Sequence, residues 1–250
     1  MVKHKIYHRP PSRFSSIENF SERTYYKEKY YGEKYDKMFE KSRFEYIKRH
    51  INYKNKTLID IGCNTGFFIF EALDNGAVKA LGYEGSESAY LQLSNYVQKT
   101  HEKIAIRNDF FDLKKNNNEY YDIVHLLNVV HHLGNDYGEK ASNNDIRKLK
   151  EEIISQVNNV SYFSKYLVFQ MGFNLHGNVK YPLFEKGTKR EMIDFIQNGV
   201  KQHWHIESIG VAQSDNGYVT YHELDNKNIE RNDDLGEFLN RPIFILKSFL

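Results

Sequence analysis

The sequence of 250 residues contains one cysteine, one tryptophan and four prolines. A single cysteine, Cys63, excludes a disulfide framework and any cysteine-rich zinc module. No apolar run approaches the roughly 20 residues that a membrane-spanning helix needs. The segment from Met1 to Phe20 also lacks the apolar centre of a secretory signal. We therefore expect a cytoplasmic protein without a membrane partner.

Neither sign of charge dominates, because 35 basic residues stand against 33 acidic ones. The charge is nevertheless uneven. Residues 1–50 hold 13 basic and 7 acidic side chains, a net of +6, and the other 200 hold 22 and 26, a net of −4. Domains that bind nucleic acid usually have a pI above about 9, whereas the pI here is about 8.3. This balance argues against nucleic acid and favours a small-molecule substrate, which the basic segment attracts if it is an anion.

The first 54 residues are expected to form an N-terminal arm. Arg9-Pro10-Pro11-Ser12 indicates irregular backbone, and the apolar positions between residues 33 and 50 follow a loose helical spacing. Two interpretations stay open. The helix packs on the main domain, or the arm is a lid that closes over an anionic substrate with basic side chains and with Tyr25, Tyr26 and Tyr30.

Residues 55–250 are expected to form the main domain, because apolar runs typical of strands alternate there with amphipathic segments typical of helices. This alternation predicts an α/β fold with a mainly parallel sheet covered on both faces. Strands are expected at 57–61, 80–83, 104–106, 121–128, 166–170, 204–211 and 242–246, and helices at 67–73, 86–99, 144–160 and 189–198.

The turn after the first expected strand has the pattern Asp60-x-Gly62-x-Asn64-x-Gly66. A glycine-rich turn before a helix lets a ligand approach the backbone and presents free N–H groups to it. The nicotinamide fingerprint G-x-G-x-x-G does not fit, since Phe67 stands at the position of its third glycine. The pattern instead resembles motif I of the class I S-adenosylmethionine-dependent methyltransferases, with Asn64 in place of a glycine because asparagine tolerates positive φ.

The order of the later motifs agrees with this resemblance, which implies S-adenosyl-L-methionine as cofactor. Glu84 stands where the family binds the ribose hydroxyls, Asp109 and Phe110 where it contacts the adenine, and Asn128 where a strand end faces the methionine portion. The resemblance also implies a Rossmann-like sandwich with a mostly parallel seven-stranded sheet, a reversed last strand and the N-terminal helical arm.

Four further residues follow strands at the edge where ligands of open α/β sheets bind. His131 and His132 are candidate catalytic residues, because a histidine has a pKa near working pH and can accept a proton from the substrate. The alternative is that the pair only borders the cofactor. Asn174 and His176 are candidate substrate-binding residues. No metal site is expected, since no third ligand has a recognisable spacing.

The acceptor of the methyl group stays open among three classes. The first is a small polar, anionic or phosphorylated metabolite or glycan precursor. Enzymes of bacterial capsule gene clusters resemble this chain in composition and core, which suggests O-methylation of a capsular phosphoramidate as one instance. The second class is tRNA, because the glycine turn and paired histidines resemble enzymes that modify wobble uridine. In the third class the protein has no acceptor, because it is a noncatalytic cofactor-binding partner in a complex. The oligomeric state is not predicted.

Overall fold

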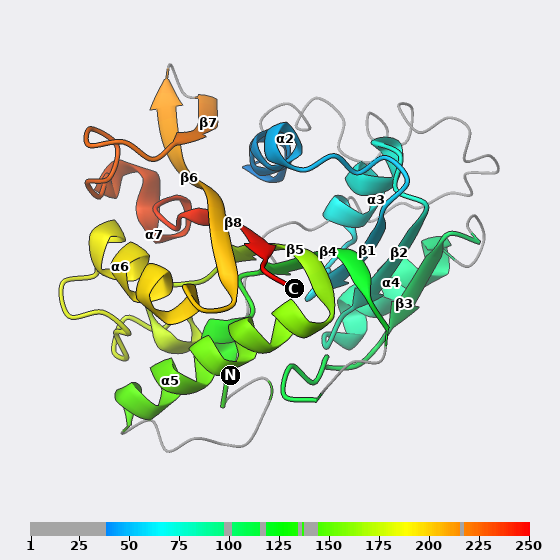
Figure 1. Cartoon of the computed structure of the whole chain (residues 1–250), viewed down its shortest axis with the longest axis horizontal. Coiled ribbons are helices and arrows are strands. Elements are labelled where there is room, and N and C mark those ends of the chain that lie inside the picture. Colours follow the sequence, from blue (N-terminus) through cyan, green and yellow to red (C-terminus); the bar gives the residue numbers. More distant parts are fainter. Residues whose placement is uncertain (1–38, 98–101, 116–118, 135–136, 138–144, 216–217) are drawn as a thin grey trace.

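The computed structural model describes residues 39–97, 102–115, 119–134, 137, 145–215 and 218–250. These residues contain an eight-stranded sheet with the strand order β3-β2-β1-β4-β5-β8-β6-β7 (Figure 1). The strands are β1 Thr57–Ile61, β2 Lys79–Tyr83, β3 Ile104–Arg107, β4 Tyr121–Leu127, β5 Ser164–Gln170, β6 Trp204–Asp215, β7 Tyr218–Glu223 and β8 Ile243–Ser248.

Helices and single turns connect these strands. The helices are α2 Phe39–His50, α3 Phe67–Asp74, α4 Glu87–Val97, α5 Ile146–Asn159, α6 Lys189–Val200 and α7 Gly236–Leu239. Turns of 3₁₀ helix occur at η2 Val130–His132, η3 Val160–Tyr162, η4 Leu175–Gly177 and η5 Asp233–Leu235. Asp145 caps α5, and Thr188 forms a capping box with Glu191 at the start of α6, as short polar side chains at these places favour.

Strands β1 to β5 are paired in parallel, and β8 lies antiparallel between β5 and β6. The expected α/β class, mostly parallel sheet and reversed last strand are confirmed. The expected number of seven strands is wrong, because β6 continues to Asp215 and pairs with an additional antiparallel strand, β7. The sequence holds a signal for this hairpin in Asn216-Gly217, a dipeptide that favours tight turns between strands.

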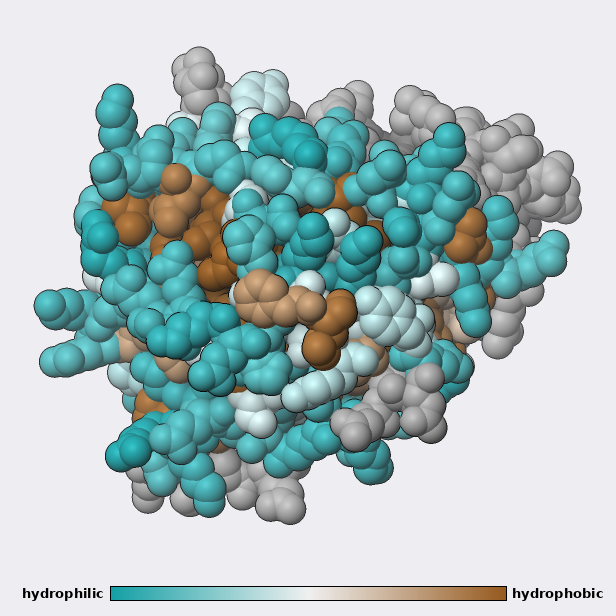
Figure 2. All heavy atoms as spheres, viewed as in Figure 1, coloured by the Kyte–Doolittle hydropathy of each residue, from teal (hydrophilic) through white to brown (hydrophobic). Residues whose placement is uncertain are grey.

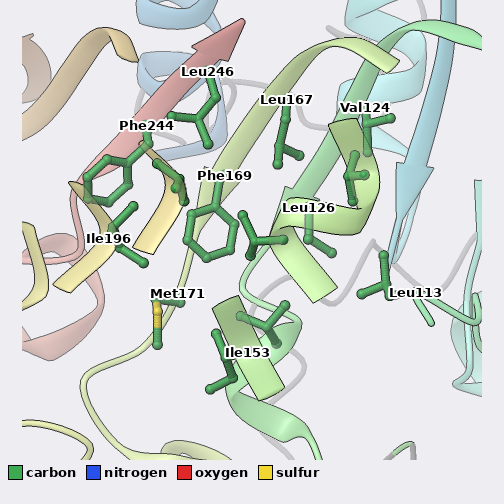
Figure 3. Close-up of a cluster of buried hydrophobic side chains, with 14 of the residues drawn as sticks. Leu113, Val124, Leu126, Ile153, Leu167, Phe169, Met171, Ile196, Phe244 and Leu246 are labelled. Atoms are coloured by element: carbon green, nitrogen blue, oxygen red, sulfur yellow. The ribbon is translucent and has the colours of Figure 1, made fainter. Parts of the chain in front are cut away.

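The core has two halves, one on each face of the sheet. Alternate residues of a strand point to opposite faces, so Leu58 of β1 joins the cluster with α2, α3 and α4, while Ile59 joins the cluster with α5 and α6. Figure 3 shows part of the second cluster, where Phe169 of β5 lies beside Phe244 of β8 and near Ile153 of α5. Apolar burial on both faces therefore holds the strand ends in fixed positions.

Helix α2 packs against the additional hairpin. The Tyr46 hydroxyl forms hydrogen bonds with Ser208 of β6 and Glu223 of β7, and its ring covers Gly210, where a Cβ would lie 2.4 Å from the ring. Arg49 donates to the Tyr221 carbonyl at 2.6 Å. The helix expected within residues 33–50 thus forms at Phe39–His50 and is tied to β6 and β7. Residues 1–38 lie outside the described part of the chain.

The described helices include none that is long and apolar enough to cross a membrane. The face shown in Figure 2 is mostly hydrophilic, with apolar side chains in small, separate groups.

Candidate functional site

The turn between β1 and α3 has the backbone that its glycines predict. Gly62 and Gly66 have φ values of 76° and 81°, and Asn64 has 49°, all in the left-handed region. A Cβ at Gly62 would lie 2.6 Å from Val129 Cγ2, so this position also requires a residue without a side chain. Gly66 is the N-cap residue directly before α3, and no side chain caps that helix end. The turn therefore lets a ligand approach its backbone closely, while the N–H groups of Gly62, Asn64 and Gly66 already have acceptors within the protein.

Asp60 is buried at the end of β1, directly before this turn. Its side chain is only 2% exposed, and its Oδ2 atom has no hydrogen-bond partner among the described residues. Burial, followed by the nearby charge of Glu84, raises the pKa of Asp60 to about 7, while Arg43 opposes this rise. A buried carboxyl oxygen without a partner costs free energy, and a cationic ligand group in the turn would relieve that cost.

Glu84 follows β2 and connects the turn to the next strand. Its two carboxyl oxygens accept hydrogen bonds from the backbone N–H groups of Asn64 and Ser86, both at 2.7 Å. Burial raises the pKa of Glu84, and the two N–H groups counteract the rise. Each carboxyl oxygen can accept more than one hydrogen bond. Glu84 therefore both fixes the turn and keeps capacity for hydroxyl donors of a ligand.

The loop after β3 places an aromatic ring beside Glu84. The Phe110 ring is 50% exposed and lies over Gly85, where a Cβ would be 2.4 Å from the ring. It stacks on Tyr137 with a centroid distance of 6.4 Å and an interplanar angle of 19°. Asp109 is exposed and accepts a hydrogen bond from the Phe110 N–H at 2.8 Å. Tyr137 is not marked by any of the sequence motifs, and its aromatic side chain, ten positions after the end of β4, is the only local signal for it.

Asn128, the residue after β4, is held by a network of polar side chains. It has a φ of 62°, its Oδ1 accepts from Arg241 at 2.7 Å, and its Nδ2 donates to Gln170 at 2.9 Å. The Asn128 N–H donates to the Gln170 carbonyl at 2.7 Å. Glu237 forms an ion pair with Arg241 at 2.5 Å. The amide of Asn128 is therefore fixed on both sides, next to Val129 and the glycine turn.

Arg43 of α2 joins the same network through the side chain of Gln170. Its Nη1 donates to Gln170 Oε1 at 3.1 Å, and its Nη2 pairs with Glu40 at 3.0 Å. The guanidinium lies 5.2 Å from the centre of the Phe68 ring and 5.1 Å from that of Phe238. No sequence pattern marks Arg43 or Gln170, because they are 127 positions apart and only the fold brings them together.

The candidate catalytic histidines lie together after β4. The rings of His131 and His132 have centroids 4.4 Å apart, and η2, which carries them, contacts η4, which carries His176. His131 is 1% exposed and fits against Gly172, where a Cβ would lie 2.7 Å from its ring. Burial lowers the pKa of His131 well below its usual value, and the nearby Arg241 adds to this effect. His131 is therefore neutral at pH 7.

His132 and His176 are half-buried, and His176 has a φ of 55°, unusual for a residue other than glycine. Asn174 precedes η4 and pairs with Pro182 in an isolated bridge. The expected substrate residues Tyr25, Tyr26 and Tyr30 lie outside the described residues. Within the described ranges, no group of three histidine, cysteine or acidic side chains could hold a metal ion.

Comparisons with known proteins agree with this geometry. Residues 59–152 match a family model described as a methyltransferase domain. The matched segment runs from β1 to α5, so it contains the glycine turn, Glu84 and the residues after β4.

Two curated relatives are similar to part of the chain. The tRNA U34 carboxymethyltransferase of Nautilia profundicola is 28% identical over 96 residues, and that of Campylobacter fetus subsp. fetus is 30% identical over 92. Each similarity covers 36% of this chain, and it covers 30% and 32% of the respective relatives. The chain thus corresponds to less than two thirds of either relative.

A solved structure shares the fold over most of the chain. The magnesium protoporphyrin IX methyltransferase of Synechocystis PCC 6803, with bound S-adenosylhomocysteine, superposes with a TM-score of 0.50. The superposition covers 83% of this chain and 80% of that protein at 14% sequence identity, so the likeness concerns the fold.

Proposed function

We propose that this chain, which carries a class I S-adenosylmethionine-dependent methyltransferase domain, transfers a methyl group to a small polar, anionic acceptor. S-adenosyl-L-methionine is the cofactor of this domain. When bound, it supplies a methyl group on a positively charged sulfur, already activated toward a nucleophile. The residues of the chain then have to bind the cofactor, orient the acceptor and exclude water.

The turn from Asp60 to Gly66, with Glu84 beside it, carries the proposal. The open backbone of the turn and the unpartnered Asp60 oxygen suit the amino-acid end of the cofactor. Glu84 suits the ribose hydroxyls, and the exposed ring of Phe110 with the neighbouring Asp109 suits the adenine.

Asn128 is proposed to border the methionine portion of the cofactor, since its neighbour Val129 lies against Gly62.

The acceptor is proposed to bind beyond β4 and β5, near His131, His132, Asn174 and His176. Orientation can lower the barrier by about 7–11 kcal/mol, whereas a general base accelerates a reaction by a factor of about 10²–10⁴. Positioning of the acceptor therefore contributes more to the rate than proton transfer does. His132 is the better candidate base, because His131 is almost completely buried.

An anionic acceptor is supported by the net charge of +6 in residues 1–50, which we propose as an arm or lid over the site. Phosphorylated metabolites and glycan precursors, including those of capsules, belong to this class. A second candidate is modification of a tRNA, which the similarity to tRNA U34 carboxymethyltransferases favours. The sequence pI of about 8.3 argues against it.

Incubation of the full chain with methyl-tritiated cofactor tests these alternatives. One sample receives phosphorylated sugars and other polar metabolites, another receives unmodified tRNA, and a third receives no acceptor. We expect tritium in the metabolite fraction. Label in tRNA that falls steeply with added salt would support the second candidate. Binding of S-adenosylhomocysteine without label in any fraction would favour a noncatalytic partner.

The affinity for S-adenosylhomocysteine is expected to rise about tenfold from pH 6 to pH 7.5. Asp60, with a pKa of about 7, is mostly protonated at the lower pH and mostly ionised at the higher one. The ionised form attracts the ammonium group of the ligand, so binding strengthens as pH rises. Titration calorimetry at both pH values measures the effect. Asp60→Asn should bind with little dependence on pH, and an unchanged dependence in this variant would contradict the assignment.

A further inference from the structure

We propose that Arg43 of α2 is a positioning residue for the cofactor site and acts on Asn128 through the side chain of Gln170. This inference rests on the proposed binding of the cofactor against the turn from Asp60 to Gly66. It concerns a residue outside the matched domain, which begins at residue 59. The N-terminal helix would then be part of the binding machinery, and not only a cover for the sheet.

The backbone at Asn128 is held by its hydrogen bonds. Its φ of 62° lies in the left-handed region, which asparagine tolerates but which is only one of the conformations open to it. The residue cannot relax freely, because its N–H is bonded to the Gln170 carbonyl and its side chain to Gln170 and Arg241. This conformation places Val129 against Gly62, with no room for even a methyl group at the glycine. A shift at Asn128 would therefore reach the turn directly.

Gln170 links Arg43 to Arg241 within this network of polar side chains. Its Oε1 accepts from both Arg43 and Asn128, and its Nε2 donates to the Arg241 carbonyl at 2.8 Å. All three hydrogen bonds fix the orientation of one amide that is 0% exposed. A buried amide with every partner in place has a single favourable orientation, and loss of one partner removes that preference.

Arg43 also acts on Asp60, before the glycine turn. It is 4% exposed, and its charge lowers the pKa of Asp60 against the effects of burial and of Glu84. The side chain lies between the Phe68 and Phe238 rings, which keep it in place. One residue of α2 thus contacts the amide network at the ends of β4 and β5 and influences the carboxyl group at the end of β1.

A double-mutant cycle tests the proposal through S-adenosylhomocysteine affinity, measured by calorimetry on the full chain. The first variant, E40Q/R43M, removes both members of the buried ion pair, so that no unpaired charge remains. The second, Gln170→Leu, keeps Arg43 but breaks the link to Asn128. Each is expected to weaken binding about tenfold, which corresponds to about 1.4 kcal/mol. The combined variant should bind no more weakly than E40Q/R43M, because Gln170→Leu interrupts a path that E40Q/R43M has already removed, and only the effect of Arg43 on Asp60 is separate from it.

Arg49→Met is the matched control, since Arg49 lies on the same helix and anchors it to Tyr221 without contacting the network. Its affinity should stay within twofold of the parent. Arg43→Lys, which keeps the charge, replaces the paired variant if that variant fails to fold. Its affinity should depend on pH as that of the parent does. The proposal would be overturned if the losses of affinity in E40Q/R43M and Gln170→Leu multiplied in the combined variant. It would also be overturned if E40Q/R43M bound with the affinity of the parent. Failure of the parent to bind S-adenosylhomocysteine would instead overturn the proposed function.

Discussion

Glu84→Ala is expected to weaken binding of S-adenosylhomocysteine by about 100-fold. A hydrogen bond to a charged group contributes about 1.5–3 kcal/mol, and the proposed contacts with two ribose hydroxyls therefore amount to at least about 3 kcal/mol. The variant also leaves the N–H groups of Asn64 and Ser86 without their acceptor. Titration calorimetry at pH 7.5 measures the change in affinity, where the effect of Asp60 protonation is small.

Two further variants test whether the loss of affinity is specific to the carboxylate of Glu84. Glu84→Gln keeps one carbonyl oxygen as an acceptor and should lose about tenfold, between the parent and the alanine variant. Glu87→Ala removes an exposed carboxylate from the first turn of α4, three residues away, and should bind as the parent does. If Glu84→Ala keeps the parental affinity while remaining folded, Glu84 does not bind the ribose.

Phe169→Ala should lower the free energy of unfolding by about 3–5 kcal/mol, the usual range for removing a fully buried phenylalanine. The Phe169 side chain is 0% exposed, and its ring centroid lies 6.1 Å from that of Phe244 (Figure 3). Urea denaturation followed by circular dichroism measures the change. The residue lies next to Gln170, so a cavity here would also loosen the end of β5.

Phe249→Ala is the matched control for this substitution. Phe249 is 61% exposed, and surface changes of this kind usually alter stability by no more than about 0.5 kcal/mol. A loss below about 1 kcal/mol in Phe169→Ala would show that the two sheet faces can repack around the missing ring.

Local patterns were sufficient for the glycine turn and for the class of the fold. The left-handed conformations at Gly62, Asn64 and Gly66 follow from which residues tolerate positive φ. Alternating strand and helix patterns depend on nearby residues, so they predicted the parallel part of the sheet. Helix boundaries such as Lys189–Val200 differed by only a few residues from the predicted range, because helix ends carry weaker local signals.

Strand β7, which the sequence patterns did not predict, was missed for a different reason. The sequence 218–223 contains mixed polar and aromatic residues, and most of the strand is exposed. It forms because β6 extends past the rest of the sheet and pairs with it, and because α2 covers the hairpin through Tyr46 and Arg49. The Asn216-Gly217 dipeptide favours a tight turn, but pairing of the residues that follow it depends on tertiary contacts.

By itself, the sequence determined the α/β class, the bend from Asp60 to Gly66 and the acidic residue after the second strand, because each depends on a few neighbouring residues. Only the tertiary structure decided which distant side chains meet at that bend. Arg43, Gln170 and Arg241 come from α2, from β5 and from the approach to β8, and they meet around Asn128. Their meeting depends on how the helices and strands pack over long sequence separations.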